Sequence, residues 1–587
     1  MRTAKNKYWV FCMLIPVLMI EQSLSAQEEK DIGTQQVTVT KSYTPSLSES
    51  FKLNTEEFDI EALLPSQRSL EYRPQEIEVV STFVPNKATP LKLKQIKKEP
   101  TTNSELSLGF GNLGQYLFDA SLSTALDNQQ VLGVDVFAEG EGSVPETLIS
   151  SSRSQLDLAT THHYNTSQFS ALHQLGFEST RSSYYGLYTD DSSIREASQN
   201  DQLDFNQQFY SVFAKSQWQW YNNWLKGIDA KFRFTGDQQS TKEQYAYIAP
   251  KFRISLFNAF LDISPSVHFL QTEFQRGYYL DVPYKYNQSK ASVQIQLSDV
   301  RNKFKYKLGA SAQYVIGDGE TAGNDIFIYP QVFIAYSDPD KKMQPYLKLN
   351  GNLRLNSYFS AFHQNPFVAP SLELRPTNEK YTGELGFTTL FQSGIEFQLA
   401  GQYSQAENFN LFQRFAAGVR MDQEGYRLAN SFGWVYDSVD RIGAFAGLKY
   451  KSKNQSEIQI RLQQNNYTLG TESVAWNLPD LEATLVSKIN LGSKIKWYST
   501  FEFLGSRTAA ERPVFLQQDP AVNQAIPVTL SAVSFVKSEI SYQVYDQWNL
   551  FARYRSVLGS QAYQWHSTPL NQNIILIGAR YKLNVNL

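Results

Sequence analysis

Histidines are the side chains in this sequence that could most readily hold a metal ion or act as a base. The chain has 587 residues and six histidines, which are His162, His163, His173, His268, His363 and His566. His162 and His163 are adjacent, so on a β-strand they point to opposite faces and cannot both bind one ion. His173 follows a predicted hairpin turn at Asn165-Thr166 and would approach one of them, but a zinc site needs at least one further ligand nearby. We therefore predict no metal site and no cofactor, and we interpret the histidines as wall or interface residues.

Nucleophilic catalysis finds no support in the motifs of the chain. Serine is abundant, so a serine that lies near a histidine carries little information. No Gly-x-Ser-x-Gly elbow lies near any histidine, and no glycine-rich loop of the phosphate-binding type is evident. The single cysteine, Cys12, lies in an N-terminal segment that we expect to be removed. We therefore predict that the protein is not an enzyme.

Residues 1–26 have the pattern of a secretory signal peptide. Three basic residues precede the apolar run Tyr8 to Ile20, and Ser23 to Ala26 offers a small-residue cleavage site before Gln27. The run is shorter than the roughly 20 apolar residues that a spanning helix needs, and no later stretch is as long as that. We expect a mature chain without thiols that is periplasmic, secreted or a membrane barrel.

The overall composition excludes one class of partner and leaves two classes of fold open. The formal net charge is −3, so no basic balance points to nucleic acid. Aromatic residues make up 14% of the chain, whereas charged residues make up only 19%. That mixture is typical of a barrel with aromatic girdles at two membrane interfaces. A β-rich carbohydrate-binding protein would show it too.

From Ser104 onward, apolar and polar residues alternate with the period of two that a β-strand imposes. In the last segment Ile575, Ile577 and Ala579 share one face, and Arg580 and Lys582 lie on the other. Charged and amide side chains crowd the second face of several such segments. A water-filled barrel lumen tolerates so polar a face, whereas the inner face of a two-sheet sandwich does not.

The connections between these segments differ strongly in length. Short turns are expected at 126–128, 337–342, 451–455, 492–493 and 546–547. Long loops are expected at about 179–201, 273–287, 356–379, 505–525 and 559–571. Outer-membrane barrels have short periplasmic turns and long extracellular loops, and no fixed repeat length indicates a propeller or solenoid.

We therefore predict an all-β fold in which residues 104–587 form a transmembrane, antiparallel outer-membrane β-barrel of about 16–22 strands. Its last strand should pair with the first, near Glu105 to Gly111, so that no edge is left free. The predicted location is the outer membrane of a Gram-negative bacterium, with membrane lipid as its surroundings.

Residues 27–103 are expected to form a short, irregular N-terminal arm in the periplasm or the lumen. Six prolines divide it, so no long helix can form. Its composition suits a solvated tether, and its short β-prone runs would also allow strand addition to a periplasmic partner.

Around the loop at 356–379, several short motifs resemble the barrels of TonB-dependent outer-membrane receptors. They are Asn365-Pro366, Leu374-Arg375-Pro376-Thr377, Glu379-Lys380-Tyr381 and Glu384-Leu385-Gly386. Val37-Thr38-Val39-Thr40 is similar to the box through which such receptors contact TonB. Only 103 − 26 = 77 mature residues precede the barrel, so the chain most resembles the short, plug-less forms of Bacteroidota-type bacteria.

The resemblance implies a receptor or transporter for an unknown ligand, with TonB or another periplasmic partner contacting residues 27–103. The alternative is a structural or accessory subunit of an outer-membrane complex, with the same arm binding a periplasmic partner.

Two of the long loops concentrate tyrosine, which suits recognition because its ring buries area at low entropic cost while its hydroxyl hydrogen-bonds. The candidate ligand-binding residues are Tyr184, Tyr185, Tyr188, Tyr278, Tyr279, Tyr284 and Tyr286. The other interpretation is that these tyrosines belong to the aromatic girdle or pack the loops into a cap.

Overall fold

A computed structural model describes most of the chain from Ser104 onward. The described residues are 104–587 apart from 146, 188–195, 197–202, 280–281, 318–324, 339–341, 392–393, 417–423, 512–524, 560–562 and 584–587. Residues 1–103 therefore lie outside the described residues, and with them the predicted signal peptide, the arm and Val37 to Thr40. No helix in the described part is both long and apolar enough to cross a membrane.

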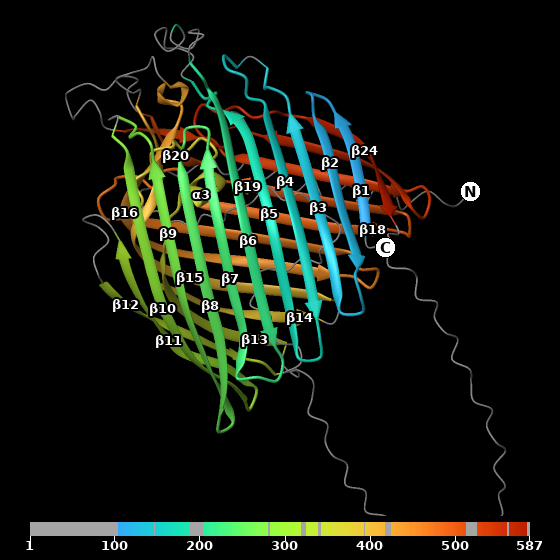
Figure 1. Cartoon of the computed structure of the whole chain (residues 1–587), viewed down its shortest axis with the longest axis vertical. Helices are drawn as coiled ribbons and strands as arrows, with labels where there is room; N and C mark the ends of the chain where they lie inside the picture. The colour runs from blue at the N-terminus through green and yellow to red at the C-terminus, as the bar shows by residue number, and fades with distance from the viewer. Residues whose placement is uncertain are drawn as a thin grey trace, which may run out of the picture.

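The described chain forms one closed, antiparallel sheet of 22 strands, which confirms the predicted barrel (Figure 1). Successive strands of the sheet pair with one another, and β1 pairs with β24 from Ser104 opposite Leu583 to Gly111 opposite Leu576. A short hairpin, β20 (Arg507–Glu511) with β21 (Ile526–Leu530), stands apart from the sheet. The barrel strands are β1 (Ser104–Gly111), β2 (Tyr116–Ala125), β3 (Gln130–Glu141), β4 (Arg153–Asn165), β5 (Phe169–Ser183), β6 (Asn206–Trp220), β7 (Leu225–Asp237), β8 (Lys242–Leu256), β9 (Ala259–Phe274), β10 (Tyr284–Arg301), β11 (Phe304–Gly317), β12 (Asp325–Tyr336), β13 (Met343–Arg354), β14 (Thr377–Phe391), β15 (Ile395–Arg414), β16 (Phe432–Lys451), β17 (Glu457–Leu469), β18 (Leu481–Leu491), β19 (Ile495–Leu504), β22 (Val533–Gln543), β23 (Trp548–Leu558) and β24 (Ile574–Leu583).

The two faces of the wall follow the alternation seen in the sequence. On β24, Ile577 is 66% exposed on the outside, whereas Arg580 is 2% exposed on the inside. Large apolar side chains are exposed on many other strands, including Leu108, Leu385 and Leu462. A surface this apolar requires a lipid environment rather than water. Trp548 and Tyr581 lie side by side on neighbouring strands, with ring centroids 4.7 Å apart.

A charge network on the inner face joins the first and last strands of the barrel. Arg580 on β24 lies 2.7 Å from Glu105 of β1 and 3.2 Å from Glu539 of β22. Glu539 also pairs with Arg553 of β23 at 2.9 Å. The backbone ladder between β1 and β24 is therefore reinforced by ion pairs on the inner face of the barrel.

The connections fall into two groups at the two ends of the barrel, as the sequence predicted. Short turns lie at the end where β1 begins and β24 finishes, at 126–129, 337–342, 452–456, 492–494 and 544–547. Longer connections lie at the other end, at 184–205, 275–283, 355–376, 505–532 and 559–573. The predictions missed three further long connections, 142–152, 415–431 and 470–480, and the hairpin inside 505–532.

Candidate functional site: a capped lumen

Several long loops pack together within the mouth of the barrel instead of extending away from it. We call residues 184–187, 203–205, 355–376, 424–431 and 563–573 the cap. Its largest buried apolar cluster combines loop residues with the ends of strands, and its members include Tyr184, Phe209, Tyr278, Tyr358, Phe362, Val368, Leu372, Phe412, Tyr426 and Trp434. The rings of Phe209 and Phe362 stack with centroids 3.9 Å apart. The loops thus have a hydrophobic core of their own.

A short helix, α3 (Tyr358–Gln364), lies in the middle of the cap. Ser357 caps its first turn, because the Ser357 hydroxyl accepts from the Ser360 N–H and the Ser360 hydroxyl accepts from the Ser357 N–H. Tyr358, Ala361 and Phe362 recur at helical spacing and are buried. The helix ends at Asn365, which precedes Pro366 and is therefore driven out of helical backbone geometry.

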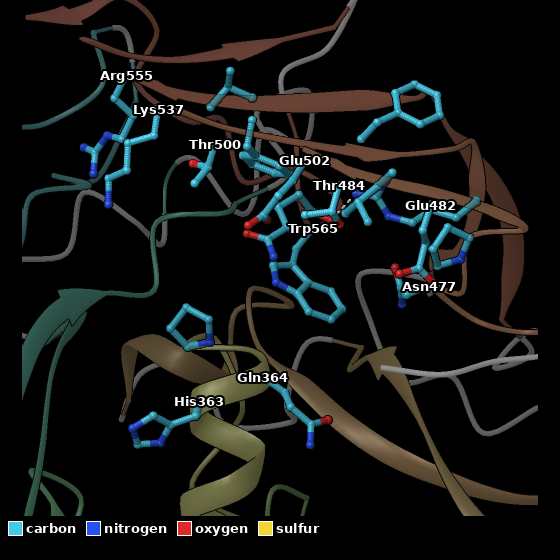
Figure 2. A pocket seen from close by; sticks show the side chains of 18 of the residues that line it. His363, Gln364, Asn477, Glu482, Thr484, Thr500, Glu502, Lys537, Arg555 and Trp565 are labelled. Carbon is cyan, nitrogen blue, oxygen red and sulfur yellow. Dashed lines mark hydrogen bonds between the residues drawn. The ribbon is translucent and has the colours of Figure 1, made fainter. Parts of the chain in front are cut away.

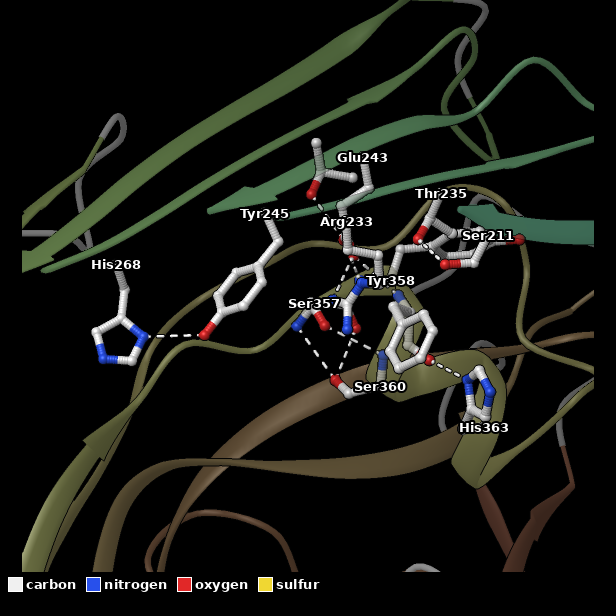
Figure 3. A network of polar contacts seen from close by, with 12 residues as sticks. Ser211, Arg233, Thr235, Glu243, Tyr245, His268, Ser357, Tyr358, Ser360 and His363 are labelled. Atoms are coloured by element: carbon white, nitrogen blue, oxygen red, sulfur yellow. Dashed lines mark hydrogen bonds and ion pairs between the residues drawn. The ribbon is translucent and has the colours of Figure 1, made fainter. Parts of the chain in front are cut away.

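Glu243, at the loop end of β8, binds the start of this helix (Figure 3). The backbone N–H groups of Tyr358 and Phe359 donate to its carboxylate at 2.6 and 3.2 Å. These are two of the N–H groups that a helix leaves without partners. The carboxylate is fully buried and also pairs with the Arg233 guanidinium at 3.5 Å. The position of α3 therefore depends on a charge provided by the wall.

Two further buried polar contacts join the cap to the wall. The Tyr358 hydroxyl donates to Asp237 of β7 at 2.7 Å. Arg414, at the end of β15, is 1% exposed and donates to backbone carbonyls of Ala429, His566 and Gly186. Those three carbonyls belong to three different loops, so one guanidinium holds the loops together.

Most of the predicted tyrosines lie in the apolar core of the cap or pack against it. Tyr184, Tyr185 and Tyr278 are buried in its core, and Tyr284 and Tyr286 pack against that core. Tyr279 is 37% exposed beside Phe415, and Tyr188 lies outside the described residues.

The hydroxyls of Tyr184 and Tyr185 form hydrogen bonds within the cap. The Tyr184 hydroxyl donates to the Val368 carbonyl at 2.9 Å, and the Tyr185 hydroxyl donates to the Pro569 carbonyl at 2.9 Å. Burial raises the pKa of Tyr184, so its hydroxyl stays protonated as a donor. The packing of loops into a cap, one of the two interpretations left open above, accounts for this geometry.

A chamber of about 640 Å³ lies beneath the cap, between α3 and the inner wall (Figure 2). The strands that line it are β4, β5, β6, β15, β17, β18, β19, β22 and β23, together with β20 of the separate hairpin. Figure 2 shows Lys537 and Arg555 on one side, Glu482 and Asn477 on the other, and Trp565 between them. The volume suits a small ligand, and the mixture of aromatic and charged side chains is typical of a binding site.

Histidines take part in this region only through His363 and His566. His363 lines the chamber, and its Nε2 atom lies 3.6 Å from the Glu178 carboxylate. His162 and His173 lie opposite each other on β4 and β5, with stacked rings 5.9 Å apart, so His173 does approach one of the adjacent pair. Within the described residues, no group of three His, Cys, Asp or Glu side chains could hold a metal ion.

Sequence reasoning missed the residues on which the cap depends most, which are Glu243, Asp237, Arg414 and the chamber residues Arg507 and Trp565. Glu243 and Tyr358 are 115 residues apart in the chain. No local pattern links two positions at that separation. The only available signal was the presence of charged residues near the loop ends of strands.

The fold and the site together define a transmembrane outer-membrane β-barrel in which the described long loops pack into a cap at one end. No protein-family model matches the chain, and no curated protein matches it. Several solved structures do match. The sequence identity of the three described next is low, so they show a shared fold with this chain and nothing more.

The closed form of the ferric-catecholate import receptor Fiu from E. coli K12 matches with a TM-score of 0.54, 10% identity and 82% of each chain covered. The pyoverdine outer-membrane receptor FpvA from Pseudomonas aeruginosa PAO1, bound to pyoverdine, matches with a TM-score of 0.57 and 11% identity, over 83% of this chain and 79% of that one. The FrpB iron transporter from Neisseria meningitidis, F5-1 variant, matches with a TM-score of 0.58, 9% identity and 82% of each chain covered. The chain therefore shares its barrel fold with these three structures.

Proposed function

We propose that this protein is an outer-membrane receptor or transporter that admits a small ligand into its lumen when the cap moves. The chamber beneath the cap supports this proposal most directly. It lies inside the barrel wall, and charged and aromatic side chains line it. The matched solved structures include an import receptor and an iron transporter, which supports the same role.

The cap fits the part of a gate because, in the described residues, side-chain contacts and one isolated backbone bridge, Val368 with Phe432 of β16, join it to the wall. The contacts of Glu243, Asp237 and Arg414 hold the loops, while the wall is held by a continuous ladder of backbone hydrogen bonds. Loops can therefore move without loss of the barrel. On this proposal the ligand enters from the long-loop side, which is extracellular in barrels of this type.

Conductance in planar bilayers tests the proposal. The full chain should be closed for most of the time, and replacing residues 358–364 by a Gly-Ser linker should give steady open steps. A matched replacement in the turn 452–456, at the opposite end, should leave the barrel closed. Absence of conductance in the 358–364 variant, with the barrel folded, would contradict a transport path.

We further propose that residues 27–103 bind a periplasmic partner of the TonB type through Val37 to Thr40. The support is the likeness of this stretch to the box of TonB-dependent receptors, together with the receptor-type barrel that follows it. Recovery of TonB with the full chain should be lost when Val37 and Val39 are both replaced by proline, because proline cannot donate to an added strand. The same double substitution at Val79 and Val80 serves as the control.

A structural or accessory role is the second candidate, and the apolar core of the cap favours it. A barrel closed by so large a core would serve as a scaffold, with the arm as its contact with a periplasmic partner. Pull-downs with and without residues 27–103 separate the candidates. Partners that depend on the arm, combined with no conductance in any cap variant, would favour the scaffold.

A further inference from the structure

Arg507 is a buried cation whose hydrogen bonds are incomplete. It begins β20 and is 5% exposed, and it lines the chamber. Its Nη2 atom donates to the Tyr563 carbonyl at 3.0 Å and to the Gln564 carbonyl. Its Nη1 atom is buried and has no hydrogen-bond acceptor. A guanidinium in this state is costly, because a buried charge is normally compensated by an acid and by hydrogen bonds.

Two other arginines of this region, Arg555 and Arg414, have partners that Arg507 lacks. Arg555, also in the chamber wall, pairs with Glu139 and Glu141 of β3. Arg414 donates from all three of its side-chain nitrogens. For Arg507, burial lowers the pKa to about 10, and no carboxylate among the described residues counters that effect. The residue is still cationic at neutral pH and needs an anion.

A second buried donor lies next to the carbonyls that Arg507 binds. Trp565 follows Gln564 in the chain, and its indole Nε1 atom is buried without an acceptor. Its ring packs against Phe412 and Phe432 at centroid distances of 5.2 and 5.5 Å. Figure 2 shows the indole projecting into the middle of the chamber. The segment 563–565 therefore positions two buried donors that lack acceptors, the Arg507 guanidinium and the Trp565 indole N–H.

The chamber also offers an apolar surface close to these donors. Phe503, Phe535 and Val557 line it from β19, β22 and β23. A ligand with an apolar body and an anionic group would contact both the apolar surface and the two donors. A planar guanidinium binds a carboxylate through two parallel hydrogen bonds. A ligand cation would leave Arg507 uncompensated, and a neutral ligand would satisfy its hydrogen bonding without its charge.

We propose that the chamber is a binding site for a small organic acid, with the carboxylate at Arg507 and Trp565 and an apolar or aromatic body against the facing wall. This inference rests on the proposed function, because it names the class of ligand that the receptor admits. It assigns Arg507 as the residue that selects anions and Trp565 as the residue that orients them.

Calorimetric titration of the purified full chain in detergent tests the inference with three probes of similar shape: benzoate, benzyl alcohol and benzylamine. Benzoate should bind at least tenfold more tightly than the other two. Arg507→Gln should lower the affinity for benzoate at least tenfold. Arg507→Lys should lower that affinity less, because lysine keeps the charge but lacks the planar guanidinium. Trp565→Phe keeps a ring without the N–H and should weaken benzoate several-fold.

Arg253→Gln is the matched control. Arg253 lies on β8 outside the chamber, where it pairs with Asp262 at 2.6 Å, so its loss should change benzoate affinity less than twofold. Equal binding of benzoate and benzyl alcohol would overturn the inference, as would no binding of benzoate or equal losses in Arg507→Gln and Arg253→Gln.

The bilayer measurement keeps this inference separate from the proposed function. A 358–364 variant that conducts, in a protein that does not bind benzoate through Arg507, would overturn the ligand class and leave transport in place. Arg507-dependent binding of benzoate without conductance in any cap variant would support the acid site and count against transport.

Discussion

The wall and the cap occupy the same barrel but are held together in different ways. Each wall strand is bound to two neighbours by a backbone ladder, and its outward side chains face lipid. In the described residues the cap has one isolated backbone bridge to the wall, Val368 with Phe432, and otherwise depends on an aromatic core and on buried polar contacts, among them those of Glu243 and Arg414. A wall built in this way tolerates the loss of single side chains, whereas a cap held mainly by side-chain contacts can open.

The largest difference between the two regions should appear when Glu243 is replaced. Glu243→Ala leaves Arg233 buried without its acid and removes the acceptor for two helix N–H groups. We expect the cap to lose about 3–5 kcal/mol while the wall stays folded. Hydrogen exchange at residues 358–364 and at the wall strands measures both.

Glu384→Gln is the control for that variant. Glu384 is a partly buried wall carboxylate whose hydrogen bonds come from the Tyr346 hydroxyl and from the Gln402 amide, not from α3. It should leave exchange in the cap unchanged. Equal exchange at 358–364 in the Glu243→Ala variant and the native protein would show that the cap does not depend on this carboxylate.

The wall can be tested by placing a charge on each of its faces. Ile577→Lys puts a cation into lipid and should cost about 2–4 kcal/mol if the position is near the midplane. Thr484→Lys puts the same cation on the chamber side, opposite Glu502, and should cost far less. Reversible unfolding in lipid vesicles gives both values. A larger loss for Thr484→Lys would reverse the assignment of the faces.

These contrasts explain which parts could be predicted from the sequence. The alternation of Ile575, Ile577 and Arg580 is local, because a strand has a period of two, so the faces, the closure with β1 and the two kinds of connection were all predicted correctly. The tyrosine-rich loops were recognised, but their packing was left open. It depends on pairs such as Tyr184 with Val368, which are 184 residues apart. Residue spacing cannot reveal contacts of that kind.

The smallest effect expected is a dependence of the cap on pH. Burial, with Arg414 nearby, lowers the pKa of His566 to about 4 in the closed cap. An opened loop would return this pKa toward its ordinary value of about 6.5. The open state therefore takes up a proton between about pH 6.5 and pH 4, and closure weakens as the pH falls through that range.

At pH 5 the free energy of cap closure should be about 1 kcal/mol less favourable, after a discount for the partial exposure of the His566 ring. His566→Gln should remove this part of the pH dependence of exchange in the cap and leave the rest. An unchanged profile in the His566→Gln variant would mean that this histidine does not titrate on opening, and the wall strands serve as the internal reference.

The central claim is that the cap closes the chamber from the long-loop side, and thiol labelling of Gln364→Cys tests it most directly. Gln364 lines the chamber, and the only natural cysteine of the sequence is Cys12. A bulky, membrane-impermeant maleimide added to intact cells should label this variant slowly. Adding Glu243→Ala should speed labelling at least tenfold. Fast labelling in the presence of Glu243, at the rate seen without it, would contradict a closed cap.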